Sequence, residues 1–267
     1  MSIRDYYYNL VSEQMIKACP QRIISLVPSV TETLFSLGLE GRIAGRTDFC
    51  VHPAGQVDSI KSVGGPKNVD YSVIDSLKPD LIIADKEENT KKIVEELSSR
   101  YPVYLSVVES FDDALRTVKE IGIITGTMDK AEEIINNIKQ KFEGLNTFKG
   151  LKAAYLIWKN PYMAAGRRTF INSILEKLGF INPFTGFEGR YPMIEVEDIK
   201  RLNTDVIFLA SEPFTFGEED KRELEEHKAA RKVILVDGEM FCWPGSHMLK
   251  APDYFRLLQA KIEEIIV

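Results

Sequence analysis

The chain of 267 residues is 44% hydrophobic and 28% charged, the composition of an ordinary globular protein with one or two domains. Its formal net charge of −6 argues against a nucleic-acid-binding surface, which is normally basic. Three cysteines, Cys19, Cys50 and Cys242, provide neither a disulfide framework nor a paired CxxC metal motif.

Residues 1–21 are predicted to form an N-terminal extension. They carry charges at Arg4, Asp5 and Lys17, and they lack the apolar core of about seven or more residues that a secretory signal peptide requires. The residues IKAC before Pro20 resemble a lipoprotein cleavage site only weakly. No stretch of the chain is long and apolar enough to span a membrane. The sequence as written therefore predicts a cytoplasmic protein without membrane insertion.

The first half of the chain alternates strands with helices. Arg22–Val27 is a buried-strand run followed by Pro28, and Ser29 and Glu32 have the spacing of a capping box at the start of a helix. The next predicted elements are strands at Asp80–Asp85 and Val103–Val108 and helices at Tyr71–Leu77, Asn89–Arg100 and Phe111–Thr125. This alternation predicts a mainly parallel sheet covered on both faces.

A central amphipathic helix is predicted over Thr127–Leu145, almost at the midpoint of the chain. Its apolar residues recur at helical spacing and form one stripe: Ala131, Ile134, Ile135, Ile138, Phe142 and Leu145. Such a helix is either an ordinary surface element or a rigid connector between two lobes.

The alternation resumes after this helix. Strands are predicted at Lys152–Ile157, Asp205–Leu209 and Val233–Val236, and helices at Thr169–Leu178, Glu218–His227 and Lys250–Ile266. Leu77–Glu88 also aligns without a gap to Leu202–Pro213, at an offset of 205 − 80 = 125 residues. This match favours two similar lobes and a connecting role for the central helix, although two common strand-helix units can converge on such a match.

The ordered set RIISLVPSVTETLFSLGLEGRIAGRT, a glycine turn and LKPDLIIAD resembles the solute-binding proteins of cobalamin and iron-siderophore ABC importers. These are the helical-backbone metal receptors, or class III periplasmic binding proteins, and the likeness runs from Arg22 to the C-terminus. The cobalamin-binding branch is the most similar. The resemblance implies an α/β fold of two Rossmann-like lobes with mainly parallel sheets, at 22–126 and 147–267. A long backbone helix at 127–146 would join them, with the ligand in the cleft between the lobes and only small lobe movements.

The resemblance also assigns residues to the ligand and to a permease. Pro28, Ser29 and Phe49 match positions that face the corrinoid from the N-terminal lobe, and a loop of the C-terminal lobe matches at Met240, Phe241, Cys242 and Trp243. Family members carry a glutamate near the start of one helix in each lobe, which pairs with arginines of the permease. Glu197 fits this position in the second lobe. Ser72 stands at the corresponding position of the first lobe, where Asp70 is the nearest substitute.

Aromatic residues concentrate in the loops that follow predicted strands, where open α/β sheets bind their ligands. The candidates are Trp158, Tyr162, Tyr191, Phe214, Phe216, Phe241 and Trp243. Flat aromatic faces suit a corrin or a similar planar chelate, although several of these rings can instead pack between loops. Arg190 is the best of several basic candidates for binding polar groups of the ligand, and Glu212 is predicted to face the same cleft.

Cys50, His52 and His247 raise the question of a metal site or a nucleophile. Two of them lie in a Cys-x-His pattern, which supplies two ligands where a closed zinc site needs four. His247 is a candidate axial ligand to the metal of a bound chelate, and packing or hydrogen bonding is the alternative. A Cys-His catalytic pair does not follow from proximity in sequence.

The sequence thus predicts a non-enzymatic solute-binding protein that captures a corrinoid or another metal chelate. It would serve an ABC-type uptake system with a permease partner, or be a cytoplasmic relative of such proteins. The family is normally extracytoplasmic. The bound corrinoid or ferric chelate would be the ligand, and no cofactor is required. The alternatives are a cytoplasmic enzyme acting on a tetrapyrrole or metal-chelate substrate, using Cys50, His52 or His247, and a binding module for an unrelated small molecule.

Overall fold

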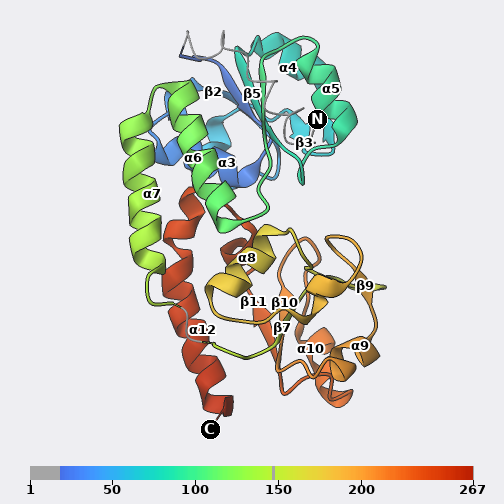
Figure 1. The fold of residues 1–267 in the computed structure, drawn as a ribbon. Coiled ribbons are helices and arrows are strands. Elements are labelled where there is room, and N and C mark those ends of the chain that lie inside the picture. Colours follow the sequence, from blue (N-terminus) through green and yellow to red (C-terminus); the bar gives the residue numbers. More distant parts are fainter. Residues whose placement is uncertain (1–18, 146–147, 267) are drawn as a thin grey trace. The chain divides into compact units, whose positions relative to one another are not determined.

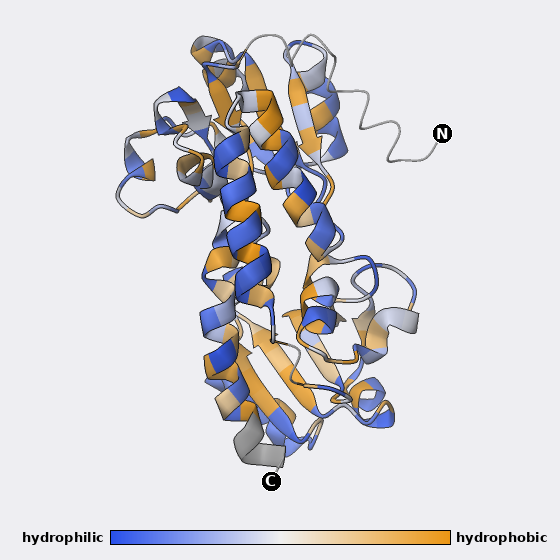
Figure 2. Ribbon diagram, turned by 60° about the vertical axis from the view of Figure 1, so that its left-hand side comes forward, coloured by the Kyte–Doolittle hydropathy of each residue, from blue (hydrophilic) through white to orange (hydrophobic). Residues whose placement is uncertain are grey.

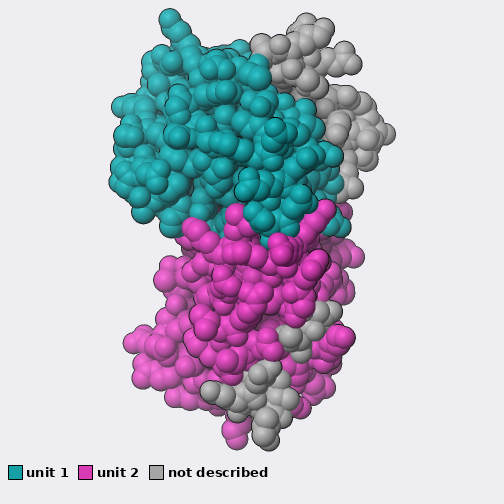
Figure 3. Space-filling view, turned by 90° about the vertical axis from the view of Figure 1, so that its left-hand side faces the viewer, with its two compact units in different colours: residues 1–108, 112–138, 244–247 teal, residues 109–111, 139–243, 248–267 magenta. Residues whose placement is uncertain are grey.

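A computed structural model describes residues 19–145 and 148–266, so most of the predicted N-terminal extension lies outside the described residues. The described chain divides into two compact units (Figure 3). Unit 1 comprises residues 19–108, 112–138 and 244–247, and unit 2 comprises 109–111, 139–243 and 248–266. None of the helices in the described ranges is long and apolar enough to cross a membrane.

Unit 1 is built on a four-stranded parallel sheet in the order β2-β1-β5-β6. The strands are β1 (Ile23–Ser25), β2 (Ile43–Arg46), β5 (Leu81–Asp85) and β6 (Val103–Ser106). Every residue of β1, β5 and β6 is buried, as expected for parallel strands covered on both faces. A short antiparallel pair, β3 (Gly64–Gly65) and β4 (Asn68–Val69), lies outside this sheet.

The helices of unit 1 follow the predicted alternation (Figure 1). They are α3 (Pro28–Ser36), α4 (Tyr71–Leu77), α5 (Lys91–Ser98) and the greater part of α6 (Phe111–Thr125), with 3-10 turns at Glu40–Arg42 and Val57–Ser59. The core includes Ile24, Leu26, Ile82 and Ala84 from the sheet. The predicted strands Asp80–Asp85 and Val103–Val108 are confirmed as β5 and β6, with bounds that differ by no more than two residues.

Unit 2 contains a five-stranded sheet in the order β11-β10-β7-β8-β9. Three strands are parallel and were predicted: β7 (Ala153–Trp158), β10 (Val206–Ala210) and β11 (Lys232–Val236). Two short antiparallel strands, β8 (Tyr162–Ala164) and β9 (Met193–Ile194), extend the sheet from the β7 side. The helices are α8 (Phe170–Lys177), α9 (Val196–Arg201), α10 (Glu218–Glu226), α11 (Glu239–Cys242) and α12 (Ala251–Ile266), with a 3-10 turn at Pro183–Gly186. A further 3-10 turn, Ser246–Leu249, has residues in both units.

The central helix is α7 (Met128–Phe142), and it contributes residues to both units, up to Ile138 in unit 1 and from Lys139 in unit 2. All six residues of its predicted apolar stripe are buried, including Leu145 just beyond its end. In Figure 2 the strands are mainly hydrophobic, whereas the helices carry hydrophilic faces. That α7 acts as a rigid connector stays a prediction.

Candidate ligand-binding site

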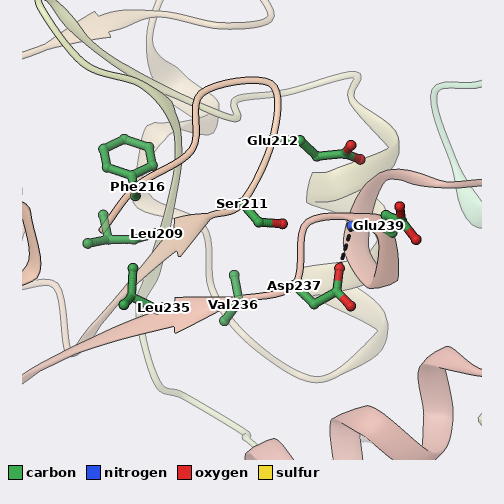
Figure 4. A pocket seen from close by; sticks show the side chains of 8 residues that line it. All are labelled: Leu209, Ser211, Glu212, Phe216, Leu235, Val236, Asp237 and Glu239. Carbon is green, nitrogen blue, oxygen red and sulfur yellow. Dashed lines mark hydrogen bonds between the residues drawn. The ribbon is translucent and has the colours of Figure 1, made fainter. Parts of the chain in front are cut away.

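A pocket of about 560 Å³ opens at the carboxyl ends of β10 and β11 in unit 2. The two strands are parallel and in register up to Ala210 and Val236, so the residues that follow them meet at one edge of the sheet. Eight residues line the pocket (Figure 4): Leu209, Ser211, Glu212, Phe216, Leu235, Val236, Asp237 and Glu239. Its size falls within the range of small-molecule sites, about 300–1,000 Å³.

Gly238 permits the two loops to approach each other. Its N–H donates to Ser211 Oγ at 2.8 Å. A Cβ at this position would lie 2.7 Å from Glu212 Cγ, closer than two carbon atoms that are not bonded to each other normally approach. Asp237 Oδ1 accepts the Glu239 N–H at 3.1 Å and so fixes the turn into α11. Backbone N–H groups of the loop after β11 therefore hold Ser211 and Asp237, which with Glu212 and Glu239 form the polar wall of the pocket.

Glu212 forms hydrogen bonds with two other residues that were predicted as ligand contacts, Cys242 and Trp243. Its Oε1 accepts the Trp243 indole N–H at 2.7 Å and the Cys242 thiol at 2.9 Å. The Trp243 side chain is buried, and Met240 is half-buried. Phe241 is fully buried and packs against Phe208, Tyr155 and Phe255, so its ring has no exposed surface to offer a ligand.

Three aromatic rings form a row from the end of β7 to the pocket. Trp158 is 42% exposed and meets Phe214 edge-to-face at 5.6 Å between ring centroids. Phe214 in turn meets Phe216, which lines the pocket, at 4.8 Å. We call Trp158, Phe214 and Phe216 the aromatic row. It offers an apolar surface beside a polar wall, which suits a large ligand with a flat core and polar side groups.

An ion-pair network fixes the β7 end of the aromatic row. Lys159 Nζ lies 2.6 Å from Asp220 Oδ1 and 2.7 Å from Glu223 Oε2 on α10. The Tyr162 hydroxyl donates to Glu223 at 3.0 Å. Burial and this hydrogen bond raise the pKa of Tyr162 to about 12. Tyr162 is thus occupied in joining the β7–β8 hairpin to α10.

Arg190, the basic candidate in unit 2, and its neighbour Arg168 have partners within that unit. Arg190 is half-buried, and its Nε donates to the Arg168 carbonyl at 2.7 Å. Arg168 pairs with both carboxylate oxygens of Glu109, at 3.0 and 3.1 Å. Tyr191, next to Arg190, is also half-buried. None of these three side chains lines the pocket.

In unit 1 the two predicted ligand contacts differ in exposure. Phe49 follows β2 and is 62% exposed, so it offers an apolar surface. Ser29 is buried within the first turn of α3. The predicted capping box is wrong: α3 begins at Pro28, and its N-cap, Val27, makes no side-chain cap hydrogen bond. Proline fits the first helical position, since the N–H it lacks would have no partner inside the helix.

Glu32 pairs with His247 instead of capping α3. Glu32 Oε2 lies 2.6 Å from His247 Nδ1, and both side chains are buried. The neighbouring Ser246 N–H donates to Thr33 Oγ1 at 3.0 Å. The segment Pro244–His247 is thereby anchored on α3. These contacts are those of a packed, hydrogen-bonded histidine, and an axial role for His247 stays a prediction.

Cys50 is buried beside Thr31 and Thr47, whose hydroxyls lie 3.1 and 3.2 Å from its sulfur. Burial raises the pKa of its thiol, which opposes formation of the thiolate that a nucleophile requires. The His52 ring lies 5.9 Å from the His247 ring. Within the described ranges, no group of three or more His, Cys, Asp or Glu side chains could hold a metal ion.

The two predicted docking residues each stand at a helix start. Glu197 is exposed in the first turn of α9, and its Oε1 lies 3.5 Å from Lys200 Nζ. Asp70 is the exposed N-cap of α4, and its carboxylate accepts the N–H groups of Ser72 and Val73. Hydrogen bonds from Ser72 and Val73 lower the pKa of Asp70. Both units thus present an acidic residue at the start of a helix.

Most residues of the pocket were not predicted as ligand contacts. Ser211, Asp237 and Glu239 are the polar residues missed, whereas Glu212 and Phe216 were predicted. The signal for Asp237 was present, because it directly follows a predicted strand that is parallel to the strand before Glu212.

Two α/β units with largely parallel sheets, and a helix with residues in both, are the features of class III solute-binding proteins. The chain belongs to the periplasmic binding protein family, whose model matches residues 23–233. Membership places it among binding proteins rather than enzymes.

Relatives with assigned names agree with this family. The chain is 23% identical over 241 residues to the vitamin B12-binding protein of Pectobacterium carotovorum, covering 88% of this chain and 86% of that protein. It is 28% identical over 204 residues to YvrC of Bacillus subtilis, an uncharacterized ABC transporter substrate-binding lipoprotein, covering 72% of this chain and 64% of that one.

Solved structures share the fold. The periplasmic vitamin B12 binding protein BtuF of Vibrio cholerae matches with a TM-score of 0.76 at 18% identity, over 92% of this chain and 98% of that one. A periplasmic heme binding protein from Pseudomonas aeruginosa matches with a TM-score of 0.76 at 19% identity, over 91% and 92% of the two chains. These names describe periplasmic proteins and, for YvrC, a lipoprotein. The expected cytoplasmic location therefore has no support in the comparisons.

Proposed function

We propose that the chain is the solute-binding component of an ABC-type uptake system and that it binds a corrinoid or a related metal chelate. The observation that carries this proposal is the aromatic row leading into the pocket at the carboxyl ends of β10 and β11. Family membership and the names of the relatives support the same ligand class. The metal chelate is then a ligand held reversibly, and no chemistry is performed on it.

The proposed contacts in unit 2 are the aromatic row, Glu212, Met240 and Trp243. Phe49 is the proposed contact in unit 1, because its ring is largely exposed next to the strand β2. That the ligand lies in a cleft between two lobes stays a prediction from the family resemblance.

Ligand binding is tested by titrating the purified chain with cyanocobalamin, dicyanocobinamide, haemin and a ferric hydroxamate siderophore in an isothermal calorimeter. We expect saturable binding of at least one of these chelates. If none of the four binds, the proposal fails, whatever other small molecule the chain retains.

The permease partner is tested separately from ligand binding. Glu197→Ala and Asp70→Ala are expected to leave chelate affinity unchanged, since both side chains are exposed and neither lines the pocket. Uptake through the cognate permease should fall for each variant, because the acidic contact is removed. Glu226→Ala, at another exposed carboxylate of unit 2, serves as the control. Undiminished uptake with both docking variants would contradict this part of the proposal.

A further inference from the structure

Phe49 stands at the tip of a turn of unit 1 that is anchored on both sides. The Cys50 N–H donates to the Thr47 carbonyl at 3.1 Å, so the chain reverses direction over residues 47–50. The side chains of Thr47 and Cys50 are buried, and Thr47 Oγ1 lies 3.2 Å from Cys50 Sγ. The Phe49 ring between them is largely exposed. An exposed apolar ring on an anchored turn suits ligand binding, because little conformational freedom remains to be lost.

The short β3–β4 hairpin supports this turn. The Asp48 N–H donates to the Gly64 carbonyl at 2.9 Å. Ser62 Oγ donates to Asp48 Oδ1 and accepts the Gly64 N–H at 3.1 Å. A Cβ placed on Gly65 would lie 3.6 Å from Phe49 Cε2, which is ordinary van der Waals contact. The Phe49 ring therefore lies beside the backbone of the hairpin.

Asn89 fixes the turn of this hairpin from the loop after β5. Its side chain is only 4% exposed, and its Nδ2 donates to the carbonyls of Pro66 at 3.0 Å and Leu26 at 3.5 Å. Its Oδ1 accepts the Asp85 N–H at 2.9 Å. The helix α5 is capped by Thr90, so the Asn89 side chain has no part in that cap. One buried amide thus joins the loop after β1, the β3–β4 turn and the end of β5.

We propose that Asn89 is a positioning residue for ligand binding and that it acts through Phe49. Its amide holds the Pro66 carbonyl, and Gly65, which precedes Pro66, lies beside the Phe49 ring. The inference rests on the proposed function, in which Phe49 is the contact from unit 1. A chelate would then meet a ring whose position is set before binding, and affinity is higher because less freedom is lost.

The central variant is Asn89→Asp, which keeps the shape of the side chain and replaces its donor by an oxygen. A carboxylate oxygen facing the Pro66 and Leu26 carbonyls repels them, so the β3–β4 turn should shift and Phe49 should lose its support. We expect an affinity about fivefold lower, as for one more side chain that must be ordered on binding. The probe is whichever of cyanocobalamin, dicyanocobinamide, haemin and the ferric hydroxamate siderophore binds the wild type most tightly, measured by calorimetry.

A double-mutant cycle with Phe49→Ala separates positioning from a general loss of stability. Without the ring there is nothing left to position, so Asn89→Asp should then change affinity by less than about twofold. Asn182→Asp is the matched control. Asn182 is also buried, and its amide also donates to a backbone carbonyl, that of Ala165, but it lies in unit 2. Its effect on affinity should be the same with and without the Phe49 ring.

Ser62→Ala is the second variant, in case Asn89→Asp does not fold. It removes the hydrogen bonds to Asp48 and Gly64, so it should lower affinity about threefold, and only when the Phe49 ring is present.

Three results would overturn the positioning role and leave the proposed function standing. They are unchanged affinity in Phe49→Ala, unchanged affinity in the folded positioning variant, and a loss in that variant that persists in full without the Phe49 ring. Absence of binding by all four chelates would instead overturn the proposed function itself.

Discussion

Replacing His247 with alanine should destabilise unit 1 strongly, although this residue lies far along the chain from the rest of that unit. The change leaves the Glu32 carboxylate buried without its imidazole partner, where the two groups lie 2.6 Å apart and their side chains are 2% and 8% exposed. Removing one partner of a buried hydrogen bond, so that the other group is left unsatisfied, typically costs about 1–3 kcal/mol and more where that group is charged. Even that is a large fraction of the roughly 5–15 kcal/mol by which a folded domain is stable.

The assay is urea unfolding followed by far-UV circular dichroism and by tryptophan fluorescence. Both tryptophans, Trp158 and Trp243, belong to unit 2, so a shifted transition seen only by dichroism is assigned to unit 1. His227→Ala, at the exposed end of α10, is the matched control and should change the free energy of unfolding by no more than about 0.5 kcal/mol.

A double-mutant cycle with Glu32→Ala isolates the pair from the separate effects of the two residues. The double variant should be less destabilised than the sum of the single variants, by about 1–3 kcal/mol, because no buried charge is left behind. Additivity within about 0.5 kcal/mol would refute the reasoning, since it would mean that the two side chains do not interact.

Three further changes test the site. Lys159→Met should cost about 1–2 kcal/mol at neutral pH, measured by urea unfolding, because it leaves Asp220 and Glu223 without their ammonium partner. Burial alone would raise the pKa of Asp220, but Lys159 outweighs it, and Lys159 likewise lowers the pKa of Glu223. The wild type should therefore exceed Lys159→Met in free energy of unfolding by the full amount at any pH above the ordinary pKa range of carboxyl groups. This difference should fade as the pH falls through the lowered pKa values, and a difference that persists in acid would contradict the prediction. Gly238→Ala should weaken chelate binding in calorimetry by displacing Glu212, and unchanged affinity would show that the loops adjust freely. Trp158→Ala should lower affinity about tenfold or more while leaving the unfolding midpoint nearly unchanged, because the ring is exposed; a shifted midpoint with intact affinity would make it a core residue instead.

The parts of the fold that sequence predicts well are those with a local cause. The strand β10 is a continuous apolar run, β5 is apolar up to its last residue, Asp85, and the stripe of α7 has helical spacing. In each case the local sequence is enough to predict which residues are buried. The antiparallel strands β8 and β9 have only three and two residues, too few for a readable alternation. β8 forms because β7 is available beside it, and β9 pairs with β8 in turn, so the sequence of these two strands carries no comparable signal.

The site is less predictable, because its partners are distant in sequence. Glu212, Cys242 and Trp243 were all predicted as ligand contacts, but their mutual hydrogen bonds follow only from the fold. Glu32 has the spacing of a capping residue, and nothing local indicates a histidine 215 positions away. Phe241 resembles its aromatic neighbours in sequence, yet the sheet and α12 enclose it.

The most direct test of the central claim is a crystal structure of the chain with dicyanocobinamide, in which anomalous scattering locates the cobalt. We expect a cobalt peak beside the ring of Trp158, with ligand density continuing along the aromatic row and into the pocket. A cobalt peak remote from the carboxyl ends of β10 and β11, with the aromatic row and the pocket free of ligand, would contradict it.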